Sequence, residues 1–280
     1  MSDSAHRLAS ASVNTAIRKS LEAGSIAALA TVIEGPANVG AKLLVENNEA
    51  RTGDLGSESL NQAVARYAVK FLETRDDAHA FFVTDFAPDL KESASTRILF
   101  ERIQTEARIV VFGAGHVGAA LAKLGSFAGY HVTLIDDRSE LVTREHFPHE
   151  LIALVAAETW AQAAQLAIGN GHGVSVAIVT RGHSEDEECL RAVIESNPDY
   201  VGLIGSKRRT NIVLDRLRAT GIPEEKLSTV RAPIGLDIGA VTPEEVAVAI
   251  LAEIVAERRG GSGGSLSAWR RHTGRGGKEE

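Results

Sequence analysis

The stretch RIVVFGAGHVG, residues 108–118, decides how most of this chain folds. A short apolar run leads into three glycines with the spacing GxGxxG, and a helical pattern follows directly. We expect Gly113 to make a tight turn, Gly115 to let the backbone approach a phosphate, and Gly118 to let the helix pack closely on the sheet. Unpaired N–H groups and the positive end of the helix dipole would hold the anion. The residues predicted to contact it are Gly113, Gly115, His116, Val117 and Gly118.

Short apolar strands alternate with helical patterns from Arg108 to Arg259, which is typical of a parallel sheet covered on both faces. Strands are predicted at Ile109–Phe112, Val132–Asp136, Ile152–Val155, Val174–Thr180 and Tyr200–Ile204. Helices are predicted at Val117–Phe127, Thr159–Ile168, Asp186–Glu195, Lys207–Ala219 and Pro243–Glu257, the last opened by a capping box of Thr242 and Glu245. The fold class is therefore α/β, with a Rossmann-type parallel sheet.

An acidic residue ends the second predicted strand. Asp136 lies 18 residues after Gly118, where a carboxylate can accept hydrogen bonds from ribose hydroxyls. The glycines, the strands and this acid together indicate a dinucleotide or another phosphate-bearing ligand. The alternative is that the glycines serve only a tight turn and Asp136 caps a strand.

The segment TRGHSED, residues 180–186, follows the fourth strand, so it lies at the carboxyl edge where open α/β sheets bind ligands. His183 can exchange protons near neutral pH, and Asp186 could orient its ring or help to hold a metal. These two residues are the candidate catalytic pair. In the alternative, Ser184 or Asp186 caps the next helix and His183 is a solvated loop residue.

Two further loops carry candidate binding residues. In GLIGSKRR, residues 202–209, three cations stand at a helix start, where they oppose the helix dipole, and this favours a negatively charged ligand. The alternative is a solvated basic patch. The loop APIGLDIGA, residues 232–240, is expected to close over the same site. The candidate residues here are Gly205, Ser206, Lys207, Arg208, Gly235 and Asp237.

The first hundred residues have a different pattern, which predicts a small α+β domain. Helices are expected over residues 8–23 and 57–72, and strands over 26–33, 41–45, 80–83 and 97–103, the last as an edge strand. The predicted domains are residues 1–104, a Rossmann-type domain over 105–259, and a disordered tail over 260–280 that begins with GGSGG.

Composition excludes several classes of protein. The 280 residues are 44% hydrophobic and 24% charged, as in soluble globular proteins. With 30 basic and 37 acidic residues and no basic stripe, nucleic acid is not an expected partner. No apolar stretch is long enough for a membrane span, and the first residues do not resemble a signal peptide. A single cysteine, Cys189, excludes an intrachain disulfide and fits a cytoplasmic location.

Taken together, five segments closely resemble the C-terminal domain of the XdhC/CoxI family, in the family's order: VVFGAGHVG, VTLIDDR, TRGHSEDEECL, YVGLIGSKRR and APIGLDIGAVTPEEVAVAILAEIV. The N-terminal half resembles the family's other domain more faintly. This resemblance implies an accessory factor for a molybdenum hydroxylase such as xanthine dehydrogenase. Such a factor binds molybdenum cofactor, supports its sulfuration with a cysteine desulfurase, and helps to insert it into the apoenzyme.

The chain departs from the family pattern in its N-terminal half. Ser59 stands where family members commonly carry the cysteine of a Gly-Gly-Cys segment, and Ser93–Ser95 replace a Cys-Gly-Gly segment. Thiolates are soft ligands suited to molybdenum or sulfur chemistry, and hydroxyls are not. The departure argues against any role that needs those thiolates.

Three hypotheses follow. The first is a cytoplasmic, homodimeric maturation factor, more a cofactor-binding chaperone than a catalyst, which holds molybdopterin or its dinucleotide form on the glycine turn and uses no metal site of its own. The second is an NAD(P)-dependent oxidoreductase with His183 as proton donor and Asp136 selecting NAD. The third is a regulatory paralogue that no longer handles cofactor.

Overall fold

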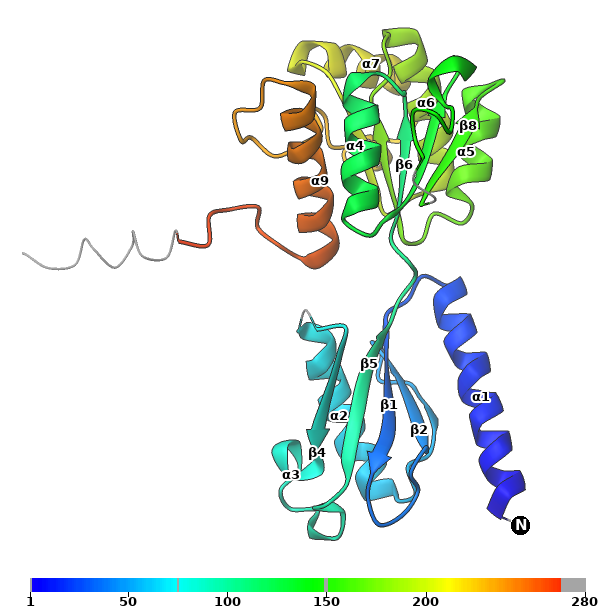
Figure 1. Ribbon diagram of the computed structural model, residues 1–280, viewed down its shortest axis with the longest axis vertical. Helices are drawn as coiled ribbons and strands as arrows, with labels where there is room; N and C mark the ends of the chain where they lie inside the picture. Colours follow the sequence, from blue (N-terminus) through cyan, green and yellow to red (C-terminus); the bar gives the residue numbers. More distant parts are fainter. Residues whose placement is uncertain (1, 75, 149–150, 268–280) are drawn as a thin grey trace, which may run out of the picture. The chain divides into compact units, whose positions relative to one another are not determined.

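A computed structural model describes residues 2–74, 76–148 and 151–267 of the chain (Figure 1). The chain divides into two compact units, Met1–Thr105 and Glu106–Glu280. One unit is built on an antiparallel sheet and the other on a parallel sheet of five strands. The predicted α/β class is therefore confirmed. The end of the predicted tail, residues 268–280, lies outside the described residues.

The parallel sheet has the strand order of a Rossmann fold, β10-β9-β6-β7-β8. Its strands are β6 (Arg108–Phe112), β7 (His131–Asp136), β8 (Ile152–Ala156), β9 (Val174–Ile178) and β10 (Tyr200–Leu203). The chain starts in the centre with β6, moves outward through β7 and β8, and then returns to the other side of β6 with β9 and β10. Open α/β sheets bind ligands where this reversal occurs, at the carboxyl ends of the strands. That point lies between β6 and β9.

Helices cover both faces of this sheet (Figure 1). They are α4 (His116–Phe127), α5 (Trp160–Ile168), α6 (His183–Ser196), α7 (Lys207–Ala219), the short α8 (Glu224–Leu227) and α9 (Pro243–Arg259), with a 3-10 turn η2 (Ser139–Leu141). Ile109 and Val111 of β6 pack in the core beneath α4 and α9, whereas Val110 and Phe112 pack in the core beneath α5, α6 and α7. Because both faces of β6 are buried, its sequence is a continuous apolar run.

The first unit is a sheet of five strands with the order β3-β2-β1-β5-β4, in which every pairing is antiparallel. Its elements are α1 (Ser2–Glu22), β1 (Ala27–Glu34), β2 (Lys42–Glu46), β3 (Arg51–Gly53), α2 (Glu58–Glu73), β4 (Ala78–Phe82), α3 (Val83–Phe86), η1 (Lys91–Ser93) and β5 (Arg97–Ile103). Val64 and Phe71 of α2 share the main core with Ile98 and Phe100 of β5. Val13 of α1 packs in a smaller cluster with residues of β1 and β2.

Two sequence-based predictions about the first unit were wrong, and so was the alternative given for His183 in the second unit. The strand β5 is not an edge strand, since it lies between β1 and β4. Its alternation, with Ile98 and Phe100 buried, reflects one covered face of the sheet and carries no information on pairing. The strand expected to include Val83 ends one residue earlier, and Val83 begins α3. His183 is not a loop residue, because α6 begins there after Gly182 as N-cap.

No helix among the described residues is both long enough and apolar enough to cross a membrane.

Candidate functional site

The three glycines of the turn after β6 have different surroundings. Gly113 has φ +107, and a Cβ atom there would lie 2.6 Å from the carbonyl oxygen of Val179. A Cβ at Gly118 would overlap the carbonyl oxygen of Gly113. At Gly115, by contrast, a Cβ would meet no atom within 4 Å. Gly113 and Gly118 are therefore required by packing, whereas Gly115 leaves open space beside the backbone, where a ligand can approach.

Two helices begin at the strand-order reversal, and both have glycine as N-cap. Gly115 precedes α4 and Gly182 precedes α6, and neither helix has a side-chain cap hydrogen bond. Four other helices, α2, α5, α7 and α9, are capped by hydroxyl side chains, those of Ser57, Thr159, Ser206 and Thr242. At α6 the Glu185 carboxylate lies close against Gly182. The start of α4 is thus the helix end whose N–H groups are open to an external anion.

Asp136, at the end of β7, holds the glycine turn in place through its side chain. Its Oδ2 accepts hydrogen bonds from the Ala114 N–H (2.7 Å) and from Arg138 Nη2 (2.9 Å), and its Oδ1 accepts from Arg138 Nε (2.8 Å) and the Arg138 N–H (2.9 Å). The residue is 1% exposed. Burial by itself raises the pKa of this carboxyl, but the hydrogen bonds from Arg138 and Ala114 outweigh it and lower the pKa to about 2. The carboxylate is ionised and engaged at both oxygens, so a ribose contact at Asp136 stays a prediction.

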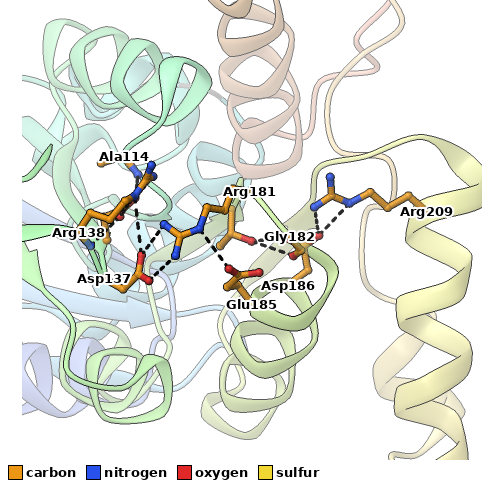
Figure 2. A network of polar contacts seen from close by, with 10 residues as sticks. Ala114, Asp137, Arg138, Arg181, Gly182, Glu185, Asp186 and Arg209 are labelled. Atoms are coloured by element: carbon orange, nitrogen blue, oxygen red, sulfur yellow. Dashed lines mark hydrogen bonds and ion pairs between the residues drawn. The ribbon is translucent and has the colours of Figure 1, made fainter.

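The next residue, Asp137, has the exposure that Asp136 lacks. Its carboxylate receives two hydrogen bonds from Arg181 in the loop after β9, at 3.2 Å from Nη1 and 2.7 Å from Nη2 (Figure 2). Arg181 Nε also lies 3.3 Å from Glu185. Neither Asp137 nor Arg181 is among the site residues predicted from the sequence. Their positions did carry a signal, because Asp137 directly follows β7 and Arg181 lies in the loop after β9, both at the carboxyl edge where open α/β sheets bind ligands.

Asp186 is not paired with His183. The Asp186 side chain is fully buried and accepts hydrogen bonds from Thr180 Oγ1 (2.5 Å) and from Arg209 Nη2 (2.6 Å) and Nε (3.2 Å) (Figure 2). Burial raises the pKa of Asp186, and the hydrogen bonds from Thr180 and Arg209 oppose that rise. His183 is exposed at the first position of α6. Asp186 therefore positions Arg209, and a catalytic role for either candidate stays a prediction.

The GLIGSKRR segment contributes charge beside this network. Gly205 has φ +145, and Ser206 caps α7 by accepting a hydrogen bond from the Arg209 N–H (3.2 Å). Lys207 and Arg208 are exposed and form no ion pair with any described residue. Of the three cations at this helix start, Asp186 neutralises Arg209, and the other two remain available to a ligand.

The loop after β10 is held against α9. Gly235, with φ +104, donates its N–H to Glu253 Oε2 (2.8 Å), and the Tyr200 hydroxyl donates to the same oxygen (2.5 Å). Burial, together with the hydrogen bond to Glu253, raises the pKa of Tyr200. Asp237 is exposed in the same loop. Gly235 thus has a structural role that the sequence did not indicate.

In the first unit, the two segments that stand in place of the family cysteines meet. Ser57 and Ser93 line one cavity of about 260 Å³, together with Asn38 and Thr96. Ser59 Oγ lies 3.2 Å from Ser57 Oγ at the start of α2. The sole cysteine of the chain, Cys189, is fully buried in α6, and burial raises the pKa of its thiol. Among the described residues, no group of three or more His, Cys, Asp or Glu side chains is placed to hold a metal ion.

These features define the second unit as a Rossmann-type domain with an open glycine turn at the strand-order reversal. Residues 109–254 match the family described as the XdhC Rossmann domain, and residues 20–82 match the XdhC and CoxI family. The chain belongs to the XdhC and CoxI family.

Several known proteins are similar to parts of the chain. The uncharacterized protein YqeB of Escherichia coli is 33% identical over 159 residues, which cover 57% of this chain and 29% of YqeB. A protein of Bacillus subtilis described as a probable subunit of xanthine dehydrogenase is 29% identical, over 59% of this chain and 47% of that protein. The molybdenum cofactor insertion chaperone PaoD of E. coli is 24% identical, over 54% of this chain and 40% of PaoD. The chain thus matches less than half the length of these relatives.

A crystal structure of a xanthine dehydrogenase from Bacillus halodurans has the same fold. It superposes with a TM-score of 0.59 at 20% identity and covers 87% of this chain and 65% of the solved chain.

Proposed function

We propose that this chain is an accessory factor for a molybdenum hydroxylase and that it binds molybdenum cofactor for delivery to the apoenzyme. The observation that carries the proposal is the open space at Gly115, beside the uncapped start of α4, in a chain of this family. Two similar proteins have names that point the same way, a molybdenum cofactor insertion chaperone and a probable xanthine dehydrogenase subunit.

The residues of the turn fit the phosphate end of the cofactor. Backbone N–H groups at the start of α4 would bind the phosphate, and Lys207 and Arg208 would supply charge from the first turn of α7, which follows β10 at the same edge of the sheet. When bound, the cofactor supplies a molybdenum centre for hydroxylation chemistry in the client enzyme. His183 would face the same edge of the sheet, as an exposed donor or acceptor at the start of α6.

The residues of the chain do not fit a thiolate contact to molybdenum. Ser57, Ser59 and Ser93 carry hydroxyls, and the thiol of Cys189 is buried. We therefore propose that sulfur reaches the cofactor from a separate cysteine desulfurase, and that this chain, as a cytoplasmic homodimer, acts as the carrier. In this scheme no cysteine of the chain itself transfers sulfur.

The test is to identify the bound ligand. The chain is purified anaerobically from cells that make molybdenum cofactor, denatured, and its released small molecules are analysed by mass spectrometry and metal analysis. Pterin with molybdenum in near-stoichiometric amount is the expected result, with loss of both in the Gly115→Asp variant. A nicotinamide dinucleotide in place of pterin would establish an oxidoreductase, and absence of any ligand after reconstitution would favour a regulatory paralogue.

A further inference from the structure

The ion pair between Asp137 and Arg181 spans the glycine turn. Strand β6 is paired with β7 on one side and with β9 on the other, with Phe112 aligned to Ile135 and to Ile178. Asp137 directly follows β7, and Arg181 lies three residues after the end of β9. Because the strands are parallel, both loops emerge at the same edge as the turn that begins at Gly113. A contact between the loops that follow β7 and β9 therefore passes over the glycine turn that follows β6.

The geometry of the pair is that of an arginine bound to an oxyanion. Arg181 places Nη1 and Nη2 on the two separate oxygens of Asp137, while its Nε faces Glu185 (Figure 2). This two-pronged arrangement is the one that guanidinium groups use for phosphate. The Asp137 carboxylate thus stands where a phosphate oxygen could bind, and Glu185 would still hold the guanidinium after an exchange.

Exposure separates this pair from its neighbours. The side chains of Arg181 and Asp137 are 47% and 36% exposed, whereas the carboxylates of Asp136, paired with Arg138, and Asp186, paired with Arg209, are 2% and 0% exposed. Ion pairs in water contribute little to stability, so this one opens readily. Arg138 Nε lies 3.9 Å from Asp137 and would offset part of its charge once Arg181 moves.

We propose that Asp137 and Arg181 together recognise a nucleoside diphosphate group. Arg181 moves from Asp137 to a phosphate held on the glycine turn, and the released Asp137 accepts hydrogen bonds from the ribose hydroxyls. A carboxylate at the end of the second strand is where Rossmann domains bind ribose, and here Asp137 is the exposed one. The inference rests on the proposed function and specifies it, since of the two forms of the cofactor only the dinucleotide carries ribose.

The test measures binding of CDP, GDP and inorganic pyrophosphate by isothermal titration calorimetry. Arg181→Gln is expected to weaken the binding of all three by roughly tenfold or more, since each loses a charge-assisted contact. Asp137→Ala is expected to affect the ligands differently. Pyrophosphate should bind more tightly because Arg181 is free, whereas CDP and GDP should lose their preference over pyrophosphate because the ribose acceptor is gone. The control is Arg191→Gln, which removes the same charge from an arginine paired with Glu187 further along α6 and should leave all three affinities within about twofold of the original.

Two results with the variants would overturn the inference. One is unchanged nucleotide affinity in Arg181→Gln, and the other is an equal change for pyrophosphate and nucleotides in Asp137→Ala. If the unmodified chain bound pyrophosphate saturably with no preference for CDP or GDP, recognition of a nucleoside diphosphate would also be rejected. Pterin that copurified with the chain would still support the proposed function in that case. Conversely, nucleotide binding by the predicted residues without copurified pterin would reject the proposed function and keep the inference. Unfolding temperatures of all variants, measured in parallel, identify any that fail to fold.

Discussion

Replacing Gly115 by aspartate should stabilise the protein and abolish ligand binding at the same time. Gly115 is the N-cap of α4 with φ −66 and ψ −174, an extended conformation that aspartate adopts readily, and its Cβ would enter open space. An aspartate there would cap the helix and face the positive end of its dipole, which together contribute about 0.5–1.5 kcal/mol. For a domain of this size the unfolding temperature should rise by about 1–5 °C. The same carboxylate occupies and repels the site of a phosphate.

The matched variant is Gly118→Ala, which changes the same turn with the opposite effect on stability. Its methyl group would overlap the Gly113 carbonyl oxygen, a backbone atom that cannot move without opening the turn. Overpacking of this kind costs about 1–3 kcal/mol or more, and alanine recovers only about 1 kcal/mol of helix propensity. Thermal unfolding by circular dichroism and pterin fluorescence of the purified variants provide the two readouts. If Gly115→Asp destabilised the protein as Gly118→Ala does, or still carried pterin, the assignment of Gly115 to the ligand would be refuted.

Three further predictions concern stability and reactivity. The pKa of Asp136 is lowered to about 2, so its hydrogen bonds stabilise the fold fully at pH values above its ordinary pKa of 3.8, and this contribution is lost as the pH falls from about 4 to 2. Asp136→Asn should therefore lower the free energy of unfolding by about 1–2 kcal/mol at pH 7, and denaturant unfolding should show a smaller difference at pH 3. Cys189 should not react with a thiol reagent such as Ellman's reagent in the native protein and should react fully after unfolding, so rapid labelling of the native chain would contradict its burial. Glu253→Ala should lower stability by about 1–3 kcal/mol and expose the loop at Gly235 to proteases, because Tyr200 and the Gly235 N–H lose their common acceptor; an unchanged unfolding temperature would argue against this anchor.

The parallel sheet could be predicted because its signals are local. A strand buried on both faces needs a continuous apolar run, as in β6, and a helix that begins on a hydroxyl cap records its start in the sequence, as Thr242 and Glu245 do for α9. The glycine turn was predictable for the same reason. The different surroundings of Gly115 and Gly118 were not, since they depend on which atoms of the turn fold back on them.

The polar network was less accessible because its partners are distant in sequence. Arg181 meets Asp137 across 44 residues, and Arg209 meets Asp186 across 23. The sequence placed Asp186 correctly near a helix start, but a polar residue there is normally exposed, and only the tertiary pairing with Arg209 explains its complete burial. The interior position of β5 was missed for the same reason, because strand pairing is not encoded in the alternation of one strand.

The glycine turn of the second unit and the segment at Ser59 in the first unit are subject to different structural constraints. In the glycine turn, Gly113 and Gly118 are fixed by backbone contacts and Asp136 by four hydrogen bonds, so the turn is maintained by folding whether or not a ligand binds. At Ser59, no packing requirement of this kind constrains the side chain, because Ser59 is exposed at the start of α2 and tolerates exchange. Serines can therefore replace thiols there without loss of the fold. Gly115 is the exception within the turn, since folding does not demand it. A glycine here, at a cap position where aspartate or serine would stabilise the helix, is the feature of the second unit that the proposed ligand binding explains and stability does not.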